Sequence, residues 1–188
     1  MSDKTATPAG AALAPAFSTD ALVTLVAEDA AVESMVAEIS KLFHVQATEI
    51  ALLRLEHNSL RFVFPAELKT SGTIPLSSSS SVAAHTASSK RIELFNNFTK
   101  IKHSRIFETV KLPRAEHSDR VQQPLIQKLV SAPIQAGKVL GVIQICRKGF
   151  DVADAGPDFS LDDVHHLEDV AKLLAAASFL RPEPEPEK

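Results

Sequence analysis

The sequence predicts an α+β domain with a mostly antiparallel sheet, and three observations support this class. Apolar residues recur with helical spacing near both ends of the chain, at 22–43 and 161–177. Between them lie strand-like segments in pairs, at 49–64 and 126–147, each joined by turn-forming residues. Helices that flank paired strands are typical of α+β domains.

The composition is that of an ordinary soluble domain. The chain has 188 residues, of which 45% are hydrophobic and 23% charged, enough for one domain with a sizeable core. Its net charge of −3 gives no global basic field for nucleic acid or anionic lipid. Cys146 is the single cysteine, which excludes an internal disulfide and a multi-cysteine zinc site. With no apolar run long enough for a membrane span, we expect a soluble cytoplasmic protein without nucleic-acid or membrane partners.

The two ends of the chain differ in composition from the rest. Residues 1–17 are mostly Ala, Pro, Thr and Gly without periodicity, which predicts a disordered lead. Residues 181–188 alternate proline with charge, and proline favours an extended, solvated chain there. The folded domain is therefore predicted over 18–180.

The first half predicts a helix followed by a β-hairpin. The apolar stripe over 22–43 indicates a helix that Ser18 or Asp20 caps, with Asp29 capping a second start if the helix breaks there. Strands follow at 49–55 and 60–64, with His57-Asn58 as the turn between them. Pro65 ends the second strand.

The middle of the chain is less regular. The last of five serines at 77–81 caps a short helix from Val82, and a short strand at 91–95 ends at Asn96-Asn97. Residues 100–128 are locally basic, and we expect one or two short helices there. The chain contains no Tyr or Trp to stack on bases, which argues against nucleic-acid binding by this segment.

The last part of the chain predicts a second hairpin and a closing helix. Strands at 126–134 and 138–147 flank Gln135-Ala136-Gly137, a tight turn with glycine at its tip. The helix begins after Ser160, with Asp162 and Asp163 in its first turn.

Three of these segments resemble a GAF domain, and the resemblance covers roughly residues 20–178. The hairpin over 129–145 is similar to the family's "vPl…gkviGvl.l" signature, and Phe159 to Leu167 resembles its "Ft.eDl.lL" helix start. Residues 73–97 resemble "ipl…siag.va…pv.i.D" without its usual glycine. The resemblance implies a six-stranded antiparallel sheet with the terminal helices on one face. It also implies a small-molecule pocket under short helices and loops on the other face, and a homodimer formed through the terminal helices.

The resemblance also bears on chemistry. Methionine-sulfoxide reductases of this family use several redox cysteines, and covalent bilin attachment uses a Cys closely followed by His; Cys146 is alone and is followed by Arg147. Of the cyclic-nucleotide motif, the matching positions are Lys148, Phe159 and Asp163, whereas Arg147 and Val164 replace its Asn and Glu. From this match we expect a structural ion pair between Lys148 and Asp163.

Candidate ligand-binding residues lie on the segments that would cover or form the pocket. They are Phe95, Asn96, Asn97, Phe98, Arg105, Phe107, Ser131 and Gln144. The asparagines suit a turn equally well, and Gln144 would otherwise donate to neighbouring backbone. His165 and His166 have aspartates at helical spacing, but a solvated helix face explains them better than a metal site. No cofactor or metal is identified.

Two functional hypotheses follow. The first is a small-molecule-binding sensory or regulatory domain in signal transduction, without catalysis. The second is a dimerisation scaffold of the same fold whose pocket is filled by its own phenylalanines.

Overall fold

The computed structural model describes residues 17–98 and 124–181. The predicted lead before residue 17, the segment with Arg105 and Phe107, and the tail from 182 lie outside the described residues. The helices are α1 (Asp20–Ala27), α2 (Val32–Phe43), α3 (Val82–Ser89) and α5 (Leu161–Leu174), with short 3-10 turns η1 (Ala47–Glu49), η2 (Ala66–Leu68) and η4 (Ser178–Leu180). The strands are β1 (Ile50–Glu56), β2 (Ser59–Phe64), β3 (Thr73–Pro75), β4 (Glu93–Phe95), β5 (Leu125–Ala136) and β6 (Lys138–Gly149).

The six strands form one antiparallel sheet in the order β3-β2-β1-β6-β5-β4. Both predicted hairpins are present. The β1–β2 turn places His57 and Asn58 at φ of 46° and 61°, the left-handed conformation that a two-residue hairpin turn requires. Gly137 turns the β5–β6 hairpin at φ 72°. The predicted α+β class and the predicted sheet are confirmed.

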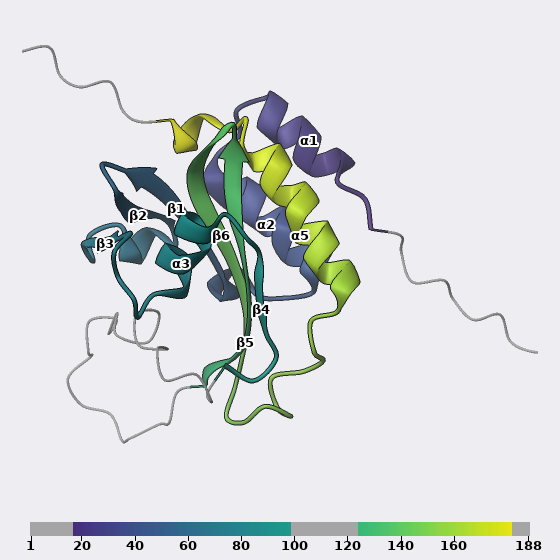
Figure 1. The fold of residues 1–188 in the computed structure, drawn as a ribbon. Helices are drawn as coiled ribbons and strands as arrows, with labels where there is room; N and C mark the ends of the chain where they lie inside the picture. Colours follow the sequence, from purple (N-terminus) through teal and green to yellow (C-terminus); the bar gives the residue numbers. More distant parts are fainter. Residues whose placement is uncertain (1–16, 99–123, 182–188) are drawn as a thin grey trace, which may run out of the picture.

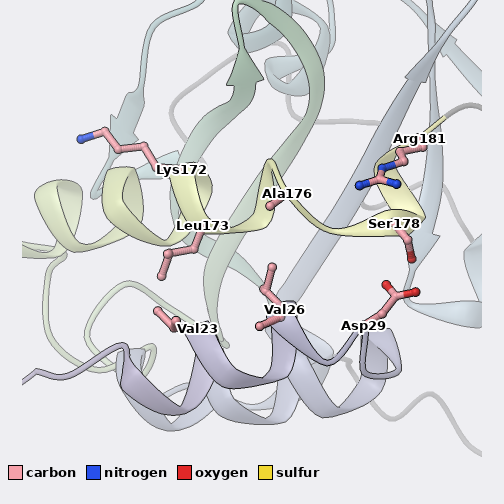
Figure 2. A pocket seen from close by; sticks show the side chains of 9 residues that line it. Val23, Val26, Asp29, Lys172, Leu173, Ala176, Ser178 and Arg181 are labelled. Atoms are coloured by element: carbon pink, nitrogen blue, oxygen red, sulfur yellow. The ribbon is translucent and has the colours of Figure 1, made fainter.

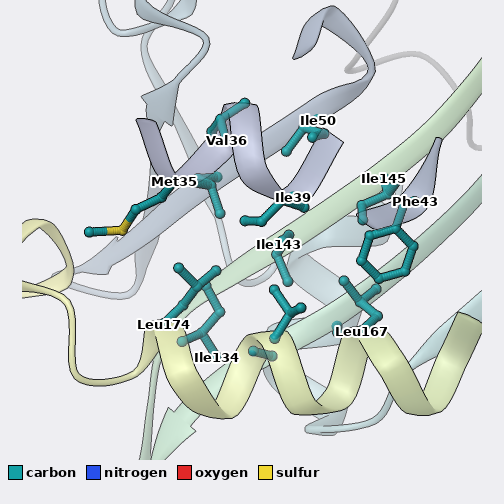
Figure 3. Close-up of a cluster of buried hydrophobic side chains, with 14 of the residues drawn as sticks. Met35, Val36, Ile39, Phe43, Ile50, Ile134, Ile143, Ile145, Leu167 and Leu174 are labelled. Carbon is teal, nitrogen blue, oxygen red and sulfur yellow. The ribbon is translucent and has the colours of Figure 1, made fainter. Parts of the chain in front are cut away.

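One face of the sheet is covered by the terminal helices. Figure 1 shows α2 and α5 side by side over the sheet, with α1 outside them. Strand positions alternate between faces, so Ile143 and Ile145 of β6 point to the same side as Ile50 of β1. There they meet α2 and α5 in a fully buried core, which Figure 3 shows from within. The predicted placement of both terminal helices on one face is therefore confirmed.

The opposite face carries α3. Ala83, Ala84 and Ala87 of this helix pack against the strand positions that alternate with the first core, such as Leu53 and Val142. As predicted, Ser81 caps the helix, because its Oγ accepts a hydrogen bond of 3.2 Å from the Ala84 amide. The small alanine side chains let α3 lie close to the sheet.

The long apolar stripe at 22–43 forms two helices rather than one. Asp29 adopts φ 52° after α1, and α2 begins at Val32. Asp29 does not cap α2: Ala31 precedes that helix, and no side chain caps it. The left-handed conformation of Asp29 ends α1 and folds it back, so α1 packs on α2 and α5 rather than on the sheet.

Strand β5 begins at Leu125, one residue before the predicted strand at 126–134. Its first residues also fall within the basic segment at 100–128, for which we expected one or two short helices, and here they are strand. The polar residues Gln127 and Lys128 are buried because each has a partner: Gln127 Nε2 donates to Gly149 O at 3.0 Å, and Lys128 Nζ pairs with Asp158 at 2.7 Å. None of the helices within 17–98 and 124–181 is long and apolar enough to cross a membrane.

Candidate functional site

The α3 face of the sheet contains a buried polar network. Ser131 on β5 and Gln144 on β6 lie opposite each other in the antiparallel register. Gln144 Nε2 donates to Ser131 Oγ at 3.2 Å, and Thr86 Oγ1 of α3 donates to the same oxygen at 2.8 Å. All three side chains are uncharged, and none is more than 5% exposed. From the sequence we predicted either a ligand or neighbouring backbone as the partner of Gln144, and within the described residues its partner is a serine hydroxyl.

This network has unused hydrogen-bonding capacity. Within the described residues, the Gln144 side chain makes one hydrogen bond, to Ser131. Ser131 Oγ accepts twice, and its own hydroxyl hydrogen remains available. The network can therefore offer an amide oxygen and a hydroxyl hydrogen to a neutral polar group.

Next to the network, the same face is apolar. Phe98 is 4% exposed and packs with Ile126, Leu129 and Cys146. Phe95 meets Phe98 edge-on, with 6.0 Å between the ring centroids. The structure thus brings Phe95 and Phe98 together with the strands that carry Ser131 and Gln144. Arg105 and Phe107 lie outside the described residues.

Cys146 is a core thiol. It is 1% exposed on the α3 face of β6, and burial is the main factor that raises its pKa to about 12. A thiol that keeps its proton is a poor nucleophile at neutral pH. The structure therefore supports the interpretation of Cys146 as a small apolar residue.

Asn96 serves as a clamp between two segments. Its Oδ1 accepts from the Phe159 amide at 2.9 Å, and its Nδ2 donates to the Phe159 carbonyl oxygen at 3.0 Å. The side-chain amide of Asn96 thereby binds the backbone N–H and C=O of one residue, as a paired strand would. Asn96 thus uses both ends of its side-chain amide within the fold. Asn97, the next residue in the chain, is half-buried.

Lys148 and Asp163 do not form the predicted ion pair. Lys148 Nζ donates to the Thr48 carbonyl oxygen at 2.7 Å. Asp163 instead accepts from the Ser160 amide and hydroxyl at 2.7 and 2.8 Å, completing the capping box of α5. Each side chain is satisfied by a residue close to it in the chain or in the adjoining loop, so neither reaches the other.

Histidines and carboxylates form no metal-binding group in the described parts of the chain. Of the two histidines on α5, His166 stacks on the Phe17 ring, with centroids 3.7 Å apart and planes within 3°. This contact holds Phe17, three residues before the start of α1, against α5.

A groove of about 590 Å³ runs between α1 and the end of α5. Figure 2 shows Val23 and Val26 of α1 facing Leu173 of α5 and Ala176, which follows that helix. Val23 is 44% exposed, so the groove is apolar and open to solvent. At one end of it stand two opposite charges, Asp29 and Arg181.

The fold agrees with a comparison of the sequence with protein families. The profile of the GAF domain matches residues 28–177, which is most of the chain. The chain belongs to the GAF domain family. Domains of this family commonly act in sensing and regulation. No curated protein sequence matches the chain.

Solved GAF domains share this fold at low sequence identity. The GAF domain of an Acinetobacter phosphoenolpyruvate-protein phosphotransferase has a TM-score of 0.58 and 18% identity, covering 84% of this chain and 90% of that one. The GAF domain of a Bacillus halodurans two-component sensor histidine kinase has a TM-score of 0.51 and 20% identity, covering 78% and 92%. The fRMsr of Staphylococcus aureus in complex with substrate, a methionine sulfoxide reductase, has a TM-score of 0.51 and 18% identity, covering 85% and 90%.

The sequence analysis missed several residues that matter in this GAF domain. Thr86 completes the buried network, and its position among the alanines on the buried side of α3 was the available signal. Phe159 receives the Asn96 clamp through its backbone, which no side-chain pattern reveals. Asp29, which the sequence analysis considered only as a helix cap, and Arg181 line the same groove because α1 folds back and η4 follows α5.

Proposed function

We propose that this GAF domain is a cytoplasmic regulatory module that binds a small molecule on the α3 face of its sheet and catalyses no reaction. The ligand site lies where β5 and β6 carry Ser131 and Gln144, beside the rings of Phe95 and Phe98. Family membership supports the regulatory role, and the binding of a ligand rests on this face alone.

The observation that carries the proposal is the buried network of Ser131, Gln144 and Thr86. A polar group buried on an apolar face is costly unless it is hydrogen-bonded, yet this network keeps an amide oxygen and a hydroxyl hydrogen in reserve. Because none of the three residues is charged, the site suits a neutral polar edge such as a carboxamide or a nucleobase. It does not suit a carboxylate or a phosphate, which need cationic or multiple N–H donors.

The chemistry of Cys146 supports the absence of catalysis. It is the one cysteine of the chain, and its raised pKa keeps it protonated. A reductase cycle through a sulfenic acid needs a thiolate and then a second thiol to resolve the intermediate. This chain offers neither condition.

A thermal-shift screen of nucleosides, nucleobases, cyclic nucleotides and amino acids tests the proposal. A compound at a hundredfold excess over its Kd stabilises the folded state by about 2.7 kcal/mol. Each kcal/mol moves the melting midpoint of a domain this size by roughly 2–4 °C, so we expect a shift of several degrees. Gln144→Leu should abolish the shift, whereas Gln135→Leu, the same change at the exposed hairpin tip, should preserve it. No shift with any compound would contradict ligand binding.

One observation favours a second function, that of a dimerisation scaffold. Phe98 already packs against Leu129 and Cys146, and Phe95 lies against Phe98. Rings that occupy this face leave less room for a ligand. In the scaffold hypothesis the domain acts through self-association alone.

Both functions include a homodimer, and the groove between α1 and α5 suits it. Among the described residues, neither Asp29 nor Arg181 has an ion-pair partner, although both stand at the same end of the groove. A two-fold axis makes contacts reciprocal, so Asp29 of each copy would meet the partner's Arg181. The apolar lining, which includes Val23 and Leu173, would be covered in the same step.

Sedimentation with charge reversal tests the dimer. Asp29→Arg and Arg181→Asp should each weaken association, because each places like charges together across the interface. The double variant restores both pairs and should recover the dimer. A monomer of 20.3 kDa at tens of micromolar for the unaltered chain would contradict it.

A further inference from the structure

Asn96 stands where the two faces of the sheet meet. It directly follows β4, the edge strand next to β5. Its neighbours Phe95 and Phe98 pack on the α3 face with Leu129 and Cys146. Its own amide instead holds the backbone of Phe159, whose ring belongs to the core under the terminal helices.

Phe159 in turn fixes the start of α5. It precedes Ser160, whose Oγ accepts from the Asp163 amide at 3.1 Å and whose carbonyl accepts from the Val164 amide at 3.2 Å. Arg147 on β6 places its guanidinium carbon 4.7 Å from the centroid of the Phe159 ring, a cation–π contact that ties the ring to the sheet. Asn96 is thus hydrogen-bonded to the residue that immediately precedes the cap of α5.

We propose that Asn96 is a positioning residue that couples the packing of Phe98 on the α3 face to the first turn of α5 on the opposite face. The two hydrogen bonds fix the orientation of one segment relative to the other, because both ends of one amide bind both ends of one residue's backbone. Since α5 also carries Leu173 of the open groove, the state of the α3 face would be transmitted to the surface that we assign to the dimer.

The biological purpose of this coupling rests on the proposed regulatory role. The coupling itself can be tested without a ligand. A failed ligand screen and a failed coupling experiment are therefore separate outcomes. The coupling is measured as non-additivity between two positions, which distinguishes a relay from a clamp that merely adds stability.

The experiment is a double-mutant cycle read by hydrogen exchange of the Asp163 and Val164 amides. In the unaltered background, Phe98→Leu disturbs the packing of the α3 face and should speed their exchange by about fivefold or more, the low end of typical couplings between sites. In the Asn96→Ala background, the same change should have no further effect. Asn96→Asp keeps the acceptor for the Phe159 amide and loses the donor, so it should retain part of the coupling.

Two controls keep the result interpretable. Leu68→Ala opens a cavity on the same face but in the cluster at β2 and α3, away from β4, and should leave both amides unchanged in either background. Phe98→Ala repeats the cycle with a larger perturbation. The proposal is overturned if Phe98→Leu accelerates exchange by the same factor with and without Asn96, or if neither Phe98 variant affects α5 while Asn96 is present.

Discussion

Ser131 and Gln144 face each other across β5 and β6, and their side chains share a hydrogen bond of 3.2 Å in the middle of the sheet. The pair sets the polarity of a face that is otherwise apolar, and Thr86 of α3 joins it from above. This small network is both the proposed ligand contact and a structural tie between helix and sheet.

The network predicts non-additive stability. Ser131→Ala removes the oxygen that serves both partners and leaves Thr86 and Gln144 unpaired in a buried site, at a cost of about 1–3 kcal/mol. The triple variant with Thr86→Val and Gln144→Leu removes every polar group and should recover much of that loss. Urea unfolding measures both; a triple variant as costly as the sum of the single changes would contradict the network.

Cys146 predicts a loss of stability at alkaline pH. The pKa of the thiol is about 12 in the folded chain against 9.0 ordinarily, so between these values the unfolded state has lost a proton that the folded state keeps. The free energy of unfolding therefore falls as pH rises above 9, by about 1.4 kcal/mol for each pH unit from this group. Unfolding curves of the unaltered chain and Cys146→Ala should converge as pH rises from 9 to 11. Parallel dependence on pH would contradict the buried thiol.

The separate contacts of Lys148 and Asp163 predict no energetic coupling. Lys148→Ala loses the bond to Thr48 O, and Asp163→Ala loses the capping box of Ser160, the latter costing about 1 kcal/mol. The double variant should cost the sum of the two within about 0.5 kcal/mol. A larger coupling energy would restore the ion pair that the sequence resemblance suggested.

Gly141 predicts a strict requirement for glycine in the middle of β6. A Cβ at this position would stand 2.1 Å from the Leu53 carbonyl oxygen, so Gly141→Ala must push β1 and β6 apart. Overpacking of this kind costs about 1–3 kcal/mol or more. Gly137→Asn is the control. Asparagine tolerates the left-handed φ of 72° at this position, and no atom lies within 4 Å of the place that its Cβ would take. Equal melting midpoints for the two variants would contradict this packing.

Most of the fold could be predicted from local signals in the sequence. Ser81 and Ser160 were identified as helix caps because capping depends on a side chain and an amide three residues apart. The turns at His57-Asn58 and Gly137 were found for a similar reason, since their residue types tolerate positive φ. Such short-range rules need no knowledge of the tertiary structure.

The site was harder to predict because its contacts join distant segments. Asn96 was selected for a ligand, yet its amide holds the backbone of Phe159, 63 residues further along. Lys128 was counted among the basic residues of 100–128 and its burial was not predicted, because its partner Asp158 lies in a loop that the hairpin brings close. Ser131 and Gln144 were both selected, but their direct contact required the register of the hairpin.

Native mass spectrometry of the purified chain tests whether this GAF domain is a dimer that binds a small molecule. The chain has a mass of 20.3 kDa, and we expect a species of twice this mass that carries a small-molecule adduct, retained by the unaltered chain and lost in Gln144→Leu. A bare dimer would favour the scaffold hypothesis over ligand binding. A bare monomer, with no adduct and no shift in the ligand screen, would contradict both ligand binding and dimerisation.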